Sequence, residues 1–148
     1  MRIRLAVESD IAEMHRVRTS VRENRLTDPE RVQPRDYRSL LSTRGRGWVS
    51  EVDGRIVAFA VVDLTRANVW ALFVEPACEG QGLGRKLHDT MMAWVFSEGA
   101  SNVWLTTAPG TRAERFYKTA GWQYSGPEPS GEARYEMPRD TWIRRSED

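Results

Sequence analysis

The sequence predicts a mixed α/β fold, in which one β-sheet is flanked by helices. The segments "GWVSEV" and "RIVAFAVVDL" flank the pair Asp53-Gly54, which is the pattern of a tight β-hairpin. Alternate glycines at 80, 82 and 84 then separate the strand-like "NVWALFV" from a segment with helical periodicity. The 148 residues suit one hydrophobic core, so we expect a single domain over residues 1–148.

The first half of the chain is expected to form one strand, two helices and the hairpin. Residues 3–6, "IRLA", are typical of a short opening strand. A helix should follow with Ser9 or Asp10 as its N-cap, because apolar residues then recur at helical spacing. These residues are Ile11, Met14, Val17 and Val21. After the polar loop "LTDPERVQP", a shorter helix is expected around Tyr37, Leu40 and Leu41.

The second half predicts a strand at 68–74, a long helix, a strand, a second helix and two short strands. The long helix has an apolar face and should end at Gly99. Its apolar positions are Leu83, Leu87, Met91 and Val95. "NVWLTT" is the next strand, and "TRAERFYKTAG" is a helix with the capping pair Thr111 and Glu114. "WQYS" and "ARYEM" complete the order β-α-α-β-β-β-α-β-α-β-β.

The composition argues against several kinds of partner. Twenty-two basic and 21 acidic residues give a net charge of +1, which favours neither nucleic acid nor an anionic membrane. The longest apolar runs are far shorter than a bilayer span, and the N-terminus shows no export signal. A lone Cys78 cannot form a disulfide framework, and this fits a cytoplasmic protein.

The glycine-rich turn is suited to a phosphate-bearing ligand. Such a turn at a helix N-terminus offers unpaired N–H groups and the positive end of the helix dipole, and Arg85 and Lys86 follow it. A dinucleotide fingerprint needs G-x-G-x-x-G, and a P-loop needs G-x-x-x-x-G-K-[ST]. The spacing G-x-G-x-G followed by arginine satisfies neither motif.

The stretch instead resembles motif A, [QR]-x-x-G-x-[GA], of the GNAT superfamily of N-acetyltransferases. Glu79, Gly82 and Gly84 occupy its three defined positions, and "RFYKTAGW" resembles the later "YxxxGF" signature. The expected element order also resembles the family along essentially the whole chain. The resemblance implies a mostly antiparallel sheet in which two adjacent parallel strands splay apart, with acetyl-coenzyme A as co-substrate in the cleft between them and no metal.

The resemblance also implies which residues hold the coenzyme. The pantetheine arm would pair with the backbone of Leu72, Phe73 and Val74, in the manner of an added strand. The pyrophosphate would lie on a loop of seven residues. These are Glu79, Gly80, Gln81, Gly82, Leu83, Gly84 and Arg85.

Glu79 departs from the family pattern, which has glutamine or arginine there. Since a carboxylate repels a pyrophosphate, we expect its side chain to point to solvent or to pair with a cation such as Arg85 or Lys86. The backbone N–H groups would then bind the phosphates. Arg112 and Arg115 either meet the adenosine phosphate or are solvated helix charges.

Tyr117 falls at the family's general-acid position, four residues before Gly121. A phenol there would protonate the departing thiolate. The competing interpretation is packing, because Tyr117 shares a helical face with apolar residues. These residues are Ala113, Phe116 and Ala120.

The general base stays unassigned, because "ANVWALFV" lacks the glutamate that many family members carry. Asn68 lies near that place and can only orient water or substrate. Glu51 and Asp63 are more typical of solvated edge charges.

The predicted function is transfer of an acetyl group from acetyl-coenzyme A to a primary amine, by direct attack in a ternary complex. A small-molecule amine is favoured over a protein as the acceptor. The sequence leaves open whether the protein forms a homodimer. The acceptor should enter between the first two helices and the final hairpin, near one or two of the six tryptophans. The alternative is a non-catalytic acyl-coenzyme A-binding sensor or partner module with the same fold.

Overall fold

The computed structural model describes residues 2–24 and 32–147, and its strands form one seven-stranded sheet of order β1-β2-β3-β4-β5-β7-β6. In chain order the strands are β1 (Arg2–Leu5), β2 (Gly45–Val52), β3 (Arg55–Asp63), β4 (Asn68–Val74), β5 (Asn102–Thr107), β6 (Gln123–Pro127) and β7 (Ala133–Pro138). The helices are η1 (Glu8–Asp10), α1 (Ile11–Ser20), α2 (Pro34–Ser42), η2 (Pro76–Cys78), α3 (Leu83–Ser97), α4 (Arg112–Thr119) and α5 (Arg139–Glu147). The polar loop expected at residues 26–34 falls largely outside the described residues.

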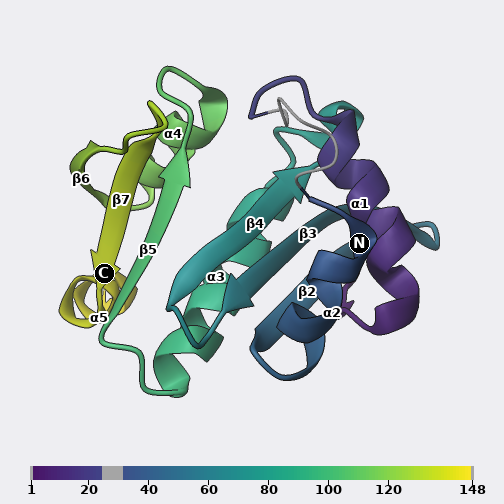
Figure 1. Ribbon diagram of the computed structural model, residues 1–148, viewed down its shortest axis with the longest axis horizontal. Helices are drawn as coiled ribbons and strands as arrows, with labels where there is room; N and C mark the ends of the chain where they lie inside the picture. The colour runs from purple at the N-terminus through teal and green to yellow at the C-terminus, as the bar shows by residue number, and fades with distance from the viewer. Residues whose placement is uncertain (1, 25–31, 148) are drawn as a thin grey trace.

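The sheet consists of two antiparallel halves that meet at a single parallel contact. Strands β1 to β4 are antiparallel neighbours, and β7 lies antiparallel between β5 and β6. Between β4 and β5 the one paired position is Asn68 with Trp104. Beyond this point the two strands diverge (Figure 1). The expected mostly antiparallel sheet with splayed parallel strands is therefore confirmed.

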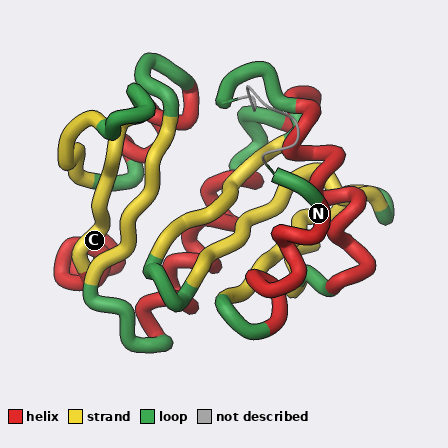
Figure 2. The backbone as a smooth tube through the Cα atoms, in the orientation of Figure 1, coloured by secondary structure: helices red, strands yellow, loops and turns green. Residues whose placement is uncertain are grey.

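Helices cover both faces of the sheet and enclose two apolar cores (Figure 2). The core under α1 and α2 includes Met14, Val17, Tyr37, Leu40 and Phe59. The core under α3 and α4 includes Leu87, Met91, Val95, Leu105 and Tyr117. Helices α1, α2, α3 and α4 pack through the apolar residues that recur at helical spacing. No helix within residues 2–24 and 32–147 is long and apolar enough to cross a membrane.

A β-bulge in β4 changes which side chains point to which core. Val61 pairs with Ala71 and Val62 pairs with Val69, which leaves Trp70 as an extra residue on β4. Consequently Val69 packs in the core under α3, whereas Ala71, two residues later, packs in the core under α1 and α2. In a regular strand these two side chains would share one face.

The expected element order holds, with one helix added at the C-terminus. Helix α5 was missed because "RDTWIRRSE" is almost entirely polar, so that no apolar periodicity predicts a helix there. Trp142 attaches this helix to the core, with its ring stacked on Phe96 at a centroid distance of 6.1 Å. The Asp53-Gly54 hairpin is present, and both residues have the positive φ that its tight turn requires.

His88 joins α3 to the segment after α4 through a buried hydrogen-bond chain. Trp122 donates its Nε1–H to His88 Nε2 at 3.0 Å, so the imidazole is neutral and carries its proton on Nδ1. Nδ1 lies 2.8 Å from Asp89 Oδ1 and donates to it. Burial lowers the pKa of His88, although Asp89 opposes this effect.

Because the folded protein resists protonation of His88, its stability should fall in mild acid. Below the ordinary histidine pKa of about 6.5, the unfolded chain binds a proton that the folded chain does not. The free energy of unfolding should therefore be constant above that pH and decrease below it. In urea titrations at pH 7 and pH 5, His88→Gln should lose less stability than the parent. Burial also lowers the pKa of His15, so His15→Gln measures the share of the other histidine. Equal losses in the parent and in His88→Gln would contradict this assignment.

Candidate functional site

Two cavities lie where β4 and β5 separate. The first, of about 960 Å³, is lined by β4, by the glycine loop (residues 79–85), by α4 and by residues 21–24. The second, of about 880 Å³, is lined by β4, β5, α2 and the turn between β6 and β7. Every residue expected to bind the coenzyme lines the first cavity except Gln81. The cleft between the splayed strands is therefore open on both faces of the sheet.

The two cavities share a wall of five residues, so they adjoin at this wall. These residues are Asn24, Leu72, Phe73, Ala113 and Tyr117. A ligand in the first cavity and a ligand in the second could therefore approach each other at this wall.

The edge of β4 that faces the cleft lacks a strand partner. After Asn68, no residue of β4 pairs with β5 within the described chain. Since only alternate backbone groups of a strand bond to one neighbour, the groups of Leu72, Phe73 and Val74 that turn away from β3 face the cleft. Such groups are costly to bury unpaired, which suits the edge to a ligand that pairs as a strand does.

The glycine loop presents free N–H groups to the first cavity. The first backbone hydrogen bond of α3 runs from Lys86 N to Gly82 O at 3.2 Å. The N–H groups of Leu83, Gly84 and Arg85 therefore have no partner within the helix. They lie at the positive end of the helix dipole, which favours an anion.

Gly84 is not required by packing against the rest of the protein. A Cβ added there would meet Val74 Cγ2 at an ordinary 3.5 Å, and its φ is not positive. Gly82 differs, because it caps α3 in the left-handed conformation with φ of 81°. The missing side chain of Gly84 thus leaves space in the cavity rather than relieving a clash.

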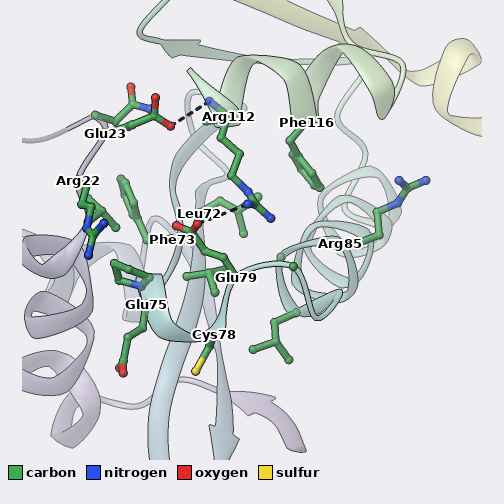
Figure 3. A pocket seen from close by; sticks show the side chains of 18 of the residues that line it. Arg22, Glu23, Leu72, Phe73, Glu75, Cys78, Glu79, Arg85, Arg112 and Phe116 are labelled. Atoms are coloured by element: carbon green, nitrogen blue, oxygen red, sulfur yellow. Dashed lines mark hydrogen bonds and ion pairs between the residues drawn. The ribbon is translucent and has the colours of Figure 1, made fainter. Parts of the chain in front are cut away.

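Glu79 pairs with Arg112 and not with the cations expected for it. Arg112 Nη1 lies 3.5 Å from Glu79 Oε2, across the mouth of the first cavity (Figure 3). Arg85 instead pairs with Asp89, one turn further along α3, at 3.5 Å. The partner was missed because α4 is distant in sequence and meets the glycine loop only in the folded chain.

Residues 21–24, which we call the bridging segment, connect the two halves of the sheet beside the cavities. Asn24 Oδ1 accepts a hydrogen bond from Ala108 N at 2.8 Å. Glu23 Oε1 accepts one from the N–H of Arg112, the first residue of α4, at 3.0 Å (Figure 3). Arg18 Nη1 in turn donates to Asn24 O at 2.7 Å. The sequence predicted that the first helix continues into this segment, because Val21 falls at helical spacing after Val17, whereas α1 ends at Ser20 and Val21 is extended.

Tyr117 is packed through its ring and free at its hydroxyl. The ring contacts Phe116 and Trp122 at centroid distances of 5.3 and 5.6 Å, and the residue is 6% exposed. Its hydroxyl makes no hydrogen bond to a described residue, and Tyr117 is one of the residues that line both cavities. Burial raises the pKa of the phenol, so it stays protonated at neutral pH. The packing of the ring is therefore observed, and the role of the hydroxyl as a general acid stays a prediction.

Asn68, Glu51 and Asp63, the polar residues considered for the general base, are held by other interactions. Asn68 lines the second cavity and donates through Nδ2 to Trp104 O at 3.2 Å, where the strands part. Glu51 pairs with Arg4 on β1 and lines neither cavity. Asp63 is fully buried and forms an ion pair with Arg44. Its interpretation as a solvated edge charge was therefore wrong.

The second cavity is lined by tryptophans and carboxylates whose place near the cleft could not be predicted from the sequence. Two of the six tryptophans, Trp70 and Trp104, line it. Its carboxylates are Asp36 and Glu132, of which Asp36 accepts from Gln33 N at the start of α2. Within residues 2–24 and 32–147, no group of three His, Cys, Asp or Glu side chains could hold a metal ion.

Comparison with known proteins identifies relatives of this chain. The model of the Acetyltransferase (GNAT) family matches residues 10–122. Serotonin N-acetyltransferase 2, chloroplastic, of Oryza sativa subsp. japonica is 39% identical over 71 residues. That match covers 46% of this chain and 34% of the relative, so the chain spans about a third of the length of this curated relative.

Solved structures share the fold over nearly the whole chain. A GNAT-family acetyltransferase from Staphylococcus aureus Mu50 aligns with a TM-score of 0.78 at 17% identity, over 93% of this chain and 98% of that one. The PaiA N-acetyltransferase from Thermoplasma acidophilum, solved with coenzyme A, aligns with a TM-score of 0.74 at 12% identity. That alignment covers 93% of this chain and 99% of the other.

The bridging segment should stabilise the protein through the Asn24 side chain. Asn24→Ala removes the acceptor for Ala108 N and leaves alanine at φ of 55°, where it is strained. We expect the free energy of unfolding to fall by about 1–2 kcal/mol in urea titrations. Asn24→Asp keeps the acceptor oxygen and tolerates the backbone, so it should lose much less. If the aspartate variant is as unstable as the alanine variant, the side-chain oxygen does not hold the segment.

Proposed function

The chain belongs to the GNAT family of acetyltransferases, and on this premise we propose that it moves the acetyl group of acetyl-coenzyme A to a primary amine. The observation that carries the proposal is that two cavities adjoin at a wall that includes Tyr117. One cavity has an anion-binding loop at its far end, and the other is open to a second substrate. This arrangement suits direct attack by the amine while both substrates are bound.

The first cavity fits the coenzyme. The free N–H groups at the start of α3 can bind the pyrophosphate, and Arg85 and Arg112 bring positive charge to the same loop. Arg112 also neutralises Glu79, which reduces repulsion between this carboxylate and the phosphates. The unpaired edge of β4 can pair with the amides of the pantetheine arm. The thioester would then reach the wall that the two cavities share.

The coenzyme supplies an activated acyl group as a thioester. When the amine nitrogen attacks the thioester carbonyl, a C–N bond forms, the C–S bond breaks and the sulfur requires a proton. Tyr117 can donate that proton, because its phenol is held protonated and has no other described partner. A free N–H of β4 can donate to the carbonyl oxygen as negative charge develops there. The acceptor ammonium first loses a proton to solvent or to Glu132, which lines the second cavity, and the proton that the nitrogen loses after attack restores the Tyr117 phenol.

The second cavity is proposed as the acceptor site. Trp70 and Trp104 line this cavity with aromatic rings, of which Trp104 also has Arg66 and Arg134 against it at 5.1 and 4.4 Å, and the volume suits a small molecule. The curated relative is named for serotonin, a small aromatic amine, which supports a small acceptor here as well. A thiol-release assay over a panel of amines and peptides tests the function. Tight coenzyme binding without acceptor-dependent thiol release would indicate a non-catalytic acyl-coenzyme A sensor.

The glycine loop gives the first test of coenzyme binding. In Gly84→Val the new side chain would occupy the space proposed for the pyrophosphate, while its Cβ meets no backbone atom of the protein. We expect coenzyme affinity, measured by calorimetric titration, to fall at least about tenfold, or 1.4 kcal/mol. Ala93→Val is the matched control, because Ala93 is exposed on the same helix and lines neither cavity. Unchanged affinity in a folded Gly84→Val protein would place the phosphates elsewhere.

Tyr117→Phe tests the general acid. The substitution keeps the ring contacts with Phe116 and Trp122 and removes a hydroxyl that has no described hydrogen-bond partner, so the fold should survive. Proton donation of this kind typically contributes about 10²–10⁴ in rate. We expect turnover to fall at least about tenfold at saturating substrates, with coenzyme affinity nearly unchanged. Single-turnover rates must be compared, because slow product release can hide the loss. A Phe variant as fast as its parent in single turnover would leave Tyr117 with packing alone.

A further inference from the structure

Arg18 is a half-buried cation in the wall of the second cavity. It lies in the last turn of α1, with its guanidinium carbon 4.1 Å from the centroid of the Phe73 ring. One of its five N–H donors is used by Asn24 O, at 2.7 Å. Phe73 and Asn24 both belong to the wall shared by the two cavities. The guanidinium therefore stacks on a residue that contacts both proposed substrate sites.

The guanidinium of Arg18 is not neutralised by the described residues. The half-buried Arg4 pairs with Asp10 and Glu51, and Arg16 pairs with Glu13 and Glu75. No ion pair joins Arg18 to a carboxylate in residues 2–24 and 32–147. Its pKa is lowered, chiefly by burial, so the surroundings oppose its charge. A cation held in this way can gain much from a bound anion.

The other charged residues that line the second cavity do not neutralise the guanidinium of Arg18. Arg35 and Arg66 are exposed on its rim, and Arg44 is paired with the buried Asp63. Of the two carboxylates, Asp36 caps α2. Glu132 exerts a charge interaction on Arg18 without forming an ion pair with it. An amine with a negative group could therefore meet Arg18 at one end while its ammonium faces Glu132 before it loses a proton.

We propose that the acceptor is a small primary amine that carries a carboxylate, and that Arg18 binds this carboxylate in the second cavity. This inference rests on the proposed acetylation of an amine. The planar fork of a guanidinium matches a carboxylate, which can accept two parallel hydrogen bonds. Trp70 and Trp104 would hold the apolar part of the molecule.

Matched pairs of amines test the substrate class. Tryptophan and tryptamine, and likewise phenylalanine and phenethylamine, differ only in the carboxylate. With the parent protein we expect kcat/KM to be about 10- to 100-fold higher for the acid of each pair. Equal use of both members, or a preference for the amine without a carboxylate, would overturn the proposal. A preference for aminoethylphosphonate over β-alanine would also overturn it, because it would assign the site to a phosphonate-like anion.

Arg18→Gln tests the residue itself. Glutamine can still donate to Asn24 O but carries no charge, so kcat/KM for the acids should fall about 10- to 100-fold, mainly through KM. Use of the amines without a carboxylate and coenzyme affinity should change less than about threefold. Arg46→Gln is the matched control, because Arg46 is also half-buried and stacks on an aromatic ring, Trp94, yet lines neither cavity. Equal losses for the acids and for the amines without a carboxylate would show that Arg18 acts only on the fold.

A binding measurement separates this inference from the proposed function. N-acetyltryptophan and N-acetyltryptamine are titrated into the protein saturated with coenzyme A, and binding is followed by calorimetry. We expect the acid to bind at least about tenfold more tightly, and this preference should disappear in Arg18→Gln. Such a preference without thiol release from any amine would support the anion site while rejecting acetyl transfer. Failure of the parent to prefer the acid would overturn the anion site, whatever the rate of thiol release.

Discussion

The separation of β4 from β5 after a single paired position is the constraint on which the site depends. At that position the Asn68 side chain bonds to Trp104 O, and Trp104 N bonds to Ala67 O at 3.0 Å. Past it, two strand edges face each other without pairing, a state that ordinary sheets avoid. The exposed edge of β4 and the two adjoining cavities follow from this one parting. The bridging segment at 21–24 offsets some of the cost by tying α1 to β5 and α4.

Much of the fold and part of the site could be predicted from local pattern. The Asp53-Gly54 hairpin, the apolar face of α3 and the Thr111 N-cap rest on interactions within a few residues, and all three are present. The glycine loop could likewise be predicted, because it depends on backbone conformation, which neighbouring residues in the sequence determine. Helix α5 was missed for the opposite reason, because it depends on contacts of Trp142 with Phe96 and His88, which are distant in sequence, rather than on a repeating stripe.

The pairing of charges could not be read from the sequence. Sequence proximity suggested Arg85 or Lys86 for Glu79, whereas the folded chain brings Arg112 from α4. Asp63, at the end of a strand, resembled a solvated charge until Arg44 was found beside it in a buried site. An ion pair needs only two side chains to approach, and residues 19 or 33 positions apart leave no periodic signal. The environment of Arg18, which has no carboxylate partner within residues 2–24 and 32–147, could not be predicted from sequence patterns for the same reason.

The bulge at Trp70 fixes the phase of the strand that carries the proposed coenzyme contacts. Because side chains alternate along a strand, one extra residue decides whether Leu72 and Val74 or Phe73 point toward α3. A deletion or insertion of one residue in β4 would reverse which of these side chains point toward α3 and would move Phe73 away from Arg18. The identities of the residues would not change. Homologues that differ in length here would therefore present a different wall to both cavities even with the same side chains. Sequence alignments of this strand should be anchored on the bulge rather than on residue identity alone.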